Sequence, residues 1–119
     1  AKLPEALRLA TLAAEKTPGN PFTLDTLGWV RYRLQEYAAA VGNLEEAHRL
    51  QPSHPEIAFH LGLAYEKVGR PQEARALLEQ AQKDAGSAPW AQEARRALER
   101  LGHAGRAEGG AERGGGDVR

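Results

Sequence analysis

The chain has 119 residues, 41% hydrophobic and 27% charged, which is ordinary for one helical globular domain. Its 16 lysines and arginines balance 16 aspartates and glutamates, so it lacks the basic surplus of a general nucleic-acid binder. No run is long and apolar enough to span a membrane, and there is no cysteine. The sequence therefore predicts no nucleic-acid binding, no membrane insertion, no disulfide and no thiolate chemistry.

The first predicted helix covers residues 3–16, where leucines interleave with alanines, and a Thr-Pro-Gly-Asn-Pro run at 17–21 ends it. Further helices are predicted at about 22–34, 37–51, 56–68 and 71–84, with Pro71 in the first turn of the last. The loops between them are short, which favours antiparallel helical hairpins.

Two stretches of the chain repeat one pattern at a constant offset of 34 residues. Glycine inside a helix costs about 1 kcal/mol against alanine, so a second helix crossing close to each helix glycine is expected to compensate. Small alanines are expected to supply the facing side of that contact. The matched positions are Leu24, Leu27, Gly28, Ala40, Leu44 and Ala47 with Ala58, Leu61, Gly62, Ala74, Leu78 and Ala81.

This period and pattern resemble the tetratricopeptide repeat. The resemblance implies an all-α fold, a right-handed α-solenoid of helix-turn-helix repeats with a C-terminal capping helix. It divides the chain into the second helix of a truncated repeat (1–20), two repeats (21–54 and 55–88), a capping helix (89–101) and a flexible glycine-rich tail (102–119). Arg31 stands where the family usually has a tyrosine, although Tyr65 keeps it in the second unit, and Gly86 replaces the closing proline.

The residues around 89–101 alternate charged side chains with alanine and leucine, which is typical of the helix that solvates the end of a repeat array. Trp90 is placed to cover the last open edge of the core. The tail beyond it has seven glycines and a single sizeable apolar side chain, Val118, so it is expected to stay disordered unless it docks.

No catalytic, cofactor or metal site is predicted. No two of His48, His54, His60 and His103 have the i, i+4 helical spacing that, with a carboxylate, would make a metal site, and no phosphate loop or nucleophile elbow is present. The protein is therefore expected not to be an enzyme.

Helical geometry selects one stripe of the first helix of each unit as the inner, concave surface. In tetratricopeptide proteins this surface commonly holds a partner's peptide or helix, and aromatic side chains are the types that dominate binding energy. Trp29 could equally pack against the neighbouring helix, whereas the hydroxyl of Tyr32 favours exposure. The predicted partner-binding residues are Phe22, Asp25, Thr26, Trp29, Tyr32, Arg33, Phe59, His60, Leu63, Glu66 and Lys67, with Glu56 on the same stripe.

The resemblance implies a non-catalytic protein-interaction scaffold whose partner is a protein or peptide. Relatives that clasp the terminal carboxylate of heat-shock chaperones present lysine and asparagine where Asp25, Thr26, Phe59 and His60 stand here, so that role is not expected. The run from Asn20 to Tyr32 resembles repeats of large bacterial tetratricopeptide proteins, several of them involved in envelope or exopolysaccharide assembly. Two alternatives stay open: an accessory domain of a larger enzyme or transferase, and a self-associating assembly module.

The chain starts with alanine and enters the repeat halfway, so we expect a fragment of a longer protein. Its first helix corresponds to the second helix of a unit. Ala6, Ala10 and Ala13 are then expected to lie open to solvent, which predicts a homodimer through this N-terminal helix or a contact in which the end helix or glycine-rich tail of a neighbouring copy covers it.

Overall fold

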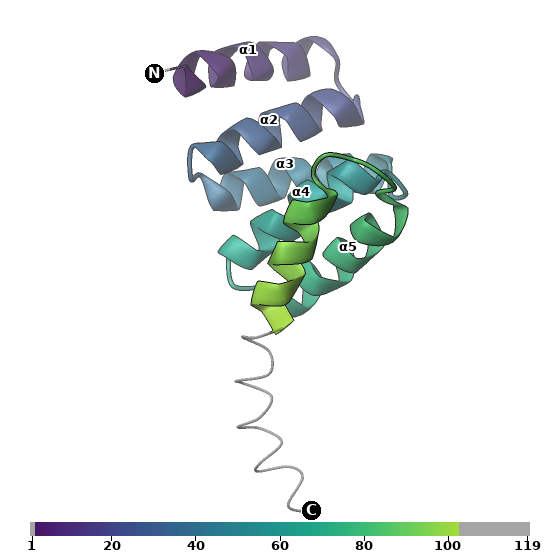
Figure 1. The fold of residues 1–119 in the computed structure, drawn as a ribbon. Helices are drawn as coiled ribbons and strands as arrows, with labels where there is room; N and C mark the ends of the chain where they lie inside the picture. The colour runs from purple at the N-terminus through teal and green to yellow at the C-terminus, as the bar shows by residue number, and fades with distance from the viewer. Residues whose placement is uncertain (1, 103–119) are drawn as a thin grey trace, which may run out of the picture.

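The computed structural model describes residues 2–102, which form helices throughout and contain no strand (Figure 1). A sixth helix, residues 91–102, follows the five labelled ones and is called the end helix below. The predicted all-α class is confirmed. The labelled helices are α1 (Leu3–Lys16), α2 (Pro21–Arg33), α3 (Tyr37–Leu50), α4 (Pro55–Lys67) and α5 (Pro71–Asp84).

The helix starts follow from the residues that the two units share. Proline occupies the first turn of α2 and α4, where a missing N–H costs nothing. Asn20 caps α2, its side-chain oxygen accepting from the backbone N–H of Phe22 at 2.8 Å. His54, one period later, caps α4 by accepting from the N–H of Ile57 at 3.4 Å. The same local chemistry thus starts the first helix of both units.

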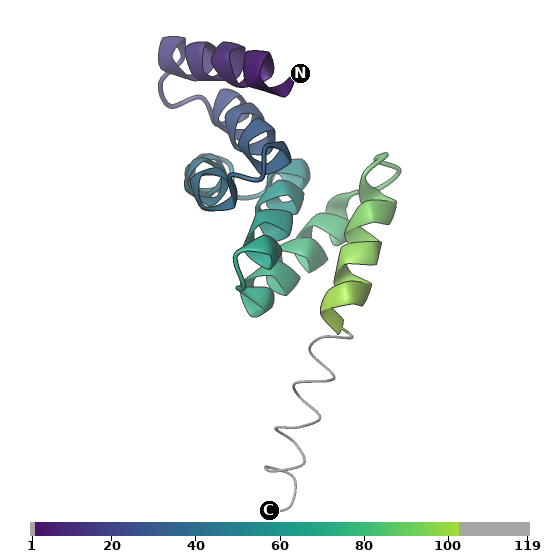
Figure 2. The ribbon, with the colours of Figure 1, turned by 90° about the vertical axis from the view of Figure 1, so that its left-hand side faces the viewer.

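Helices α2 and α3 form one hairpin, α4 and α5 form the next, and α3 also packs on α4 (Figures 1 and 2). The close approach predicted at the helix glycines is present. A Cβ built on Gly28 would lie 2.6 Å from Leu44 Cγ, and one on Gly62 would lie 2.7 Å from Leu78 Cγ. Only glycine admits these leucines so near the backbone, and Ala40, Ala47, Ala74 and Ala81 beside them are fully buried.

Helix α4 is the most enclosed element among the described residues. Every residue from Ile57 to Tyr65 is buried, whereas α2 has two buried residues, Leu27 and Gly28. The reason is position, since α4 is packed by α3, α5 and α2 and also meets the end helix. The core therefore centres on α4.

The end helix seals the second hairpin with Ala94, Ala97 and Leu101, which are all buried in the core. Before it, Trp90 stacks on Phe59 with ring centroids 4.9 Å apart, so it covers the core edge as predicted. At the positions of Leu61 and Gly62 this helix carries Arg95 and Arg96, which are exposed. The helix spans 91–102 instead of 89–101, and the rest of the predicted tail lies outside the described residues.

Helix α1 packs on α2, and this contact corrects one expectation. Ala10 is 6% exposed and not open to solvent, because its side of α1 is the side turned toward the following hairpin. Ala13 is exposed as expected, and Ala6 is half-buried. The large apolar side chains of α1 that are exposed are instead Leu9 at 51% and Leu12 at 43%.

No helix in the described part of the chain is both long and apolar enough to cross a membrane.

Candidate partner-binding groove

Helix α2 presents the accessible half of the predicted stripe. Phe22 is 49% exposed, and its ring meets His54 edge-on at 5.3 Å between centroids. Thr26 and Arg33 are also exposed, one and three turns further along the helix. Asp25, Trp29 and Tyr32 are partly buried between them. These residues come together along one side of α2, and we call this set the α2 stripe.

The α4 half of the predicted stripe is largely closed, which corrects the expectation that its residues line an open groove. Phe59, His60 and Leu63 are 2%, 6% and 0% exposed. Two tryptophans flank Phe59: Trp90 stacks on it, and Trp29 lies 6.3 Å away. Trp29 also stacks on His60, so neighbouring aromatic side chains cover Phe59 and His60.

Three charged residues of α4 lie at the border of the groove. Glu56 and Lys67 are exposed. Glu66 has 18% of its side chain exposed, because Arg100 of the end helix donates to both of its oxygens, at 2.8 and 3.0 Å. This fork-shaped pair ties the end helix to α4 and occupies Glu66, so that carboxylate is not free to bind a partner.

Trp29 lies at the centre of an aromatic cluster. Its ring stacks on Tyr32 at 4.8 Å with an interplanar angle of 8°, and on His60 at 4.1 Å with an angle of 19°. Of the two roles left open by the sequence, the geometry gives Trp29 the packing role, with a residual exposed edge. The stack fixes the indole orientation, so Trp29 forms a rigid part of the stripe.

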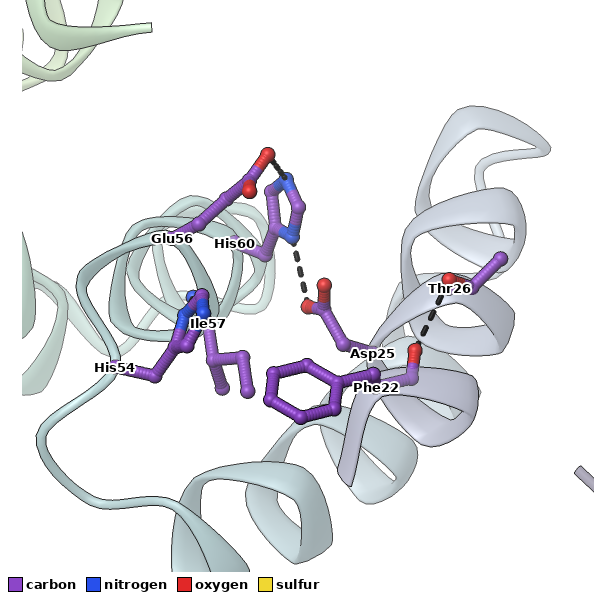
Figure 3. A network of polar contacts seen from close by, with 7 residues as sticks. All are labelled: Phe22, Asp25, Thr26, His54, Glu56, Ile57 and His60. Atoms are coloured by element: carbon purple, nitrogen blue, oxygen red, sulfur yellow. Dashed lines mark hydrogen bonds and ion pairs between the residues drawn. The ribbon is translucent and has the colours of Figure 1, made fainter. Parts of the chain in front are cut away.

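A polar contact joins the first helices of the two units (Figure 3). His60 Nδ1 lies 2.7 Å from Asp25 Oδ1, with 8% and 15% of the two side chains exposed. On the other side of the ring, Nε2 lies 3.8 Å from a carboxylate oxygen of Glu56, too far for a hydrogen bond. Asp25 is therefore the hydrogen-bond partner of His60, and the pair ties α2 to α4.

Replacing Asp25 by alanine is expected to lower the free energy of unfolding by about 1–3 kcal/mol, because a buried imidazole loses its partner. Asp25→Asn retains a side-chain oxygen and should cost less. Glu56→Ala removes the distant, half-exposed carboxylate and should change stability by less than about 0.5 kcal/mol. Urea denaturation of the three variants measures this, and equal losses for Asp25→Ala and Glu56→Ala would contradict the assignment.

Burial raises the pKa of the Tyr32 hydroxyl to about 12, and the neighbouring Tyr37, Glu66 and Glu93 add to the rise. Tyr65 behaves alike: burial raises its pKa to about 12, helped by the hydrogen bond it donates to Glu45 at 2.5 Å. Both hydroxyls therefore stay protonated at about pH 10, where a free tyrosine is half ionised. Tyr32 is available there as a neutral donor at the edge of the stripe.

The sequence predicts that Trp90 covers the core edge, but the place of Trp90 and Arg100 beside the α4 half of the stripe was not predicted. Trp90 and Arg100 stand two periods after Phe22 and Tyr32, at the same register positions, so extending the 34-residue offset once more would have found them. Within residues 2–102, no three histidine, aspartate or glutamate side chains are grouped so that they could hold a metal ion.

Comparison with known proteins agrees with this architecture. The sequence profile of the tetratricopeptide repeat matches residues 26–89, more than half of the chain. The chain therefore belongs to the tetratricopeptide repeat family.

Two individual proteins are similar to it. The TPR repeat-containing protein PA4667 of Pseudomonas aeruginosa is 40% identical over 58 residues, which cover 49% of this chain but 10% of that protein. The chain thus spans about a tenth of that relative's length. The solved structure of SycD, the type III secretion translocator chaperone of Yersinia enterocolitica, superposes with a TM-score of 0.73 at 18% identity, covering 84% of this chain and 72% of SycD. At that identity the likeness concerns the fold.

Proposed function

We propose that the protein is a non-catalytic interaction module that binds a peptide or helix of a protein partner along the α2 stripe. The observation that carries the proposal is Phe22, an aromatic side chain left half exposed with its ring held edge-on against His54. Aromatic residues of this kind supply most of the energy at protein interfaces. Thr26 and Arg33 continue the surface along α2, and Asp25, Trp29 and Tyr32 support it from below.

The proposed contact surface is narrower than the stripe selected from the sequence. Phe59, His60 and Leu63 act through packing, and Glu66 through its pair with Arg100, so none of them is assigned a direct contact. Glu56 and Lys67 stay at the border. A surface of this size is below that of a standard interface, so we expect affinities of roughly micromolar strength.

The test is a selection of binding peptides from a phage-displayed library on the immobilised 119-residue chain, followed by calorimetry with a synthetic selected peptide. The double variant Phe22→Ala, Arg33→Ala should bind about tenfold more weakly, because it removes the aromatic anchor and the exposed cation three turns further along α2. Arg49→Ala, on the exposed side of α3, is the matched control and should bind as wild type. A peptide that binds the wild type, the double variant and Arg49→Ala with equal affinity would show that its binding site lies outside the α2 stripe.

A broader role rests on the relatives. SycD is described as a chaperone of a translocator, so a client protein is the class of partner that the fold resemblance suggests. Because the chain spans a tenth of the Pseudomonas relative, an accessory role within a larger enzyme or transferase is the alternative proposal. Assays of the product of the full open reading frame for catalytic activity distinguish the client-binding role from the accessory role.

We also propose self-association through α1, because Leu9 and Leu12 form the most exposed apolar surface of that helix. This surface is separate from the α2 stripe, so association and partner binding are independently testable. Sedimentation of the purified chain over a range of concentrations tests the association.

A further inference from the structure

One side of α1 carries Glu5, Leu9, Leu12 and Lys16, spaced four, three and four residues apart. This spacing places them in one row along the helix. All four side chains are exposed, the two leucines by 51% and 43%. We call this row the α1 row.

The side of the helix next to the α1 row is covered in the later helices, although the row's own equivalents in α3 and α5 are half-buried or exposed. Ala13 beside the α1 row is exposed, whereas Ala47 of α3 and Ala81 of α5, one and two periods later, are fully buried. In the later hairpins α2 packs on α3 and α4 packs on α5, with Leu44 and Leu78 against the helix glycines. The fold therefore uses the side next to the row's position to hold another helix. On α1 a shallow apolar hollow around Leu7 and Leu12 continues the open surface.

The order of residues in the α1 row indicates what can bind to it. It reads acid, leucine, leucine, base, and it is symmetric in spacing about its centre. Two parallel copies would place Glu5 against a second glutamate and Lys16 against a second lysine, which is unfavourable. Two antiparallel copies would bring opposite charges together at both ends and the leucines together in the middle.

We propose that α1 pairs antiparallel with α1 of a second copy, with Leu9 against Leu12 of the partner subunit and Glu5 against Lys16 of the partner subunit. The twofold symmetry repeats each contact, as in an isologous dimer. This register rests on the proposed self-association and gives it a defined geometry.

The charges of α1 itself permit this arrangement. Within one copy Glu5 accepts from Arg8 at 3.4 Å, and 67% of each side chain is exposed. Such an exposed ion pair contributes little to stability, so Glu5 is available to a second cation. A helix of 14 residues is about 21 Å long, so the contact is small and the dimer should form in the micromolar to millimolar range.

Analytical ultracentrifugation of the full chain at low ionic strength, from micromolar to millimolar concentration, tests the register with four variants. Leu12→Glu should abolish the dimer, since it places charge in the apolar centre. Glu5→Lys and Lys16→Glu should each weaken dimerisation about tenfold, because two attractive contacts become two repulsive ones. The double variant Glu5→Lys, Lys16→Glu exchanges the charges and should restore the dimer to within about threefold of wild type.

The outcomes separate the two levels of the proposal. A chain that stays monomeric throughout, or that associates equally well with Leu12→Glu, overturns self-association through α1. If Leu12→Glu abolishes the dimer but the double charge variant dimerises no better than the single charge variants, the antiparallel register is overturned. The α1 row would then associate in another register. All substituted side chains are exposed, and circular dichroism of each variant verifies that the helices are retained.

Discussion

Replacing Phe59 by alanine is expected to lower the free energy of unfolding by about 3–5 kcal/mol, the range for truncating a buried phenylalanine. Phe59 is 2% exposed and touches both Trp90 and Trp29, so its removal leaves a cavity between α2, α4 and the end helix. Chemical denaturation followed by circular dichroism measures the loss.

The chain supplies a matched control for this experiment, because its other phenylalanine, Phe22, occupies the same predicted stripe but is 49% exposed. Phe22→Ala should cost about 1 kcal/mol or less, the loss of an edge contact with His54. Similar losses for the two variants would mean that Phe59 is not a core residue. The pair thus compares a buried and an exposed phenylalanine on the same predicted stripe.

Gly62→Ala is expected to destabilise the fold by about 1–3 kcal/mol, although alanine is the better helix former by about 1 kcal/mol. The added methyl would lie 2.7 Å from Leu78 Cγ and 3.3 Å from the backbone oxygen of Ala74, so α4 and α5 would have to move apart. Gly28→Ala should behave in the same way against Leu44.

Gly42 in α3 is the control, because a Cβ built there meets nothing within 4 Å. Gly42→Ala should therefore raise the thermal midpoint, gaining about 0.5–1 kcal/mol of stability from helix propensity alone. Thermal unfolding of the three alanine variants gives the comparison. A loss of stability at Gly42, or a gain at Gly62, would contradict the close-approach account.

The repeat architecture was predictable because its requirements recur at fixed positions. A glycine in a helix is costly, and finding two at an offset of 34 residues, each followed by leucine and alanine at constant spacing, points to one hairpin contact used twice. The structure contains that contact at Gly28 and Gly62. The residues within each unit thus determine how its two helices pack against each other.

Which groove residues stay accessible was not predictable in the same way. The helical pattern assigns Phe22 and Phe59 to the same side of their helices, but their exposure depends on the element that succeeds each unit in the chain. Phe59 is covered by Trp90, which lies beyond the two matched repeats. A helical pattern specifies which side of a helix a residue occupies, whereas burial is decided by neighbours distant in the chain.

The same limit explains the error at Ala10. Its register position is the one that Leu44 fills opposite Gly28, which suggested a face open to a missing helix. In the fold that position also borders the following hairpin, and α2 covers it. A residue between two packing surfaces cannot be assigned to one of them from its spacing alone.

The enclosure of α4 has a consequence for how the molecule opens. In an array whose units touch only their neighbours, cooperativity is set by nearest-neighbour contacts, and local opening starts where contacts are fewest. Among the described residues α1 packs on α2 alone, whereas α4 packs on α2, α3 and α5, so within residues 2–102 we expect α1 to open before α4. The α2 stripe lies between α1 and α4, on a helix stable enough to keep its shape. Because α2 also packs on α1, a partner bound to the stripe should slow the opening of α1.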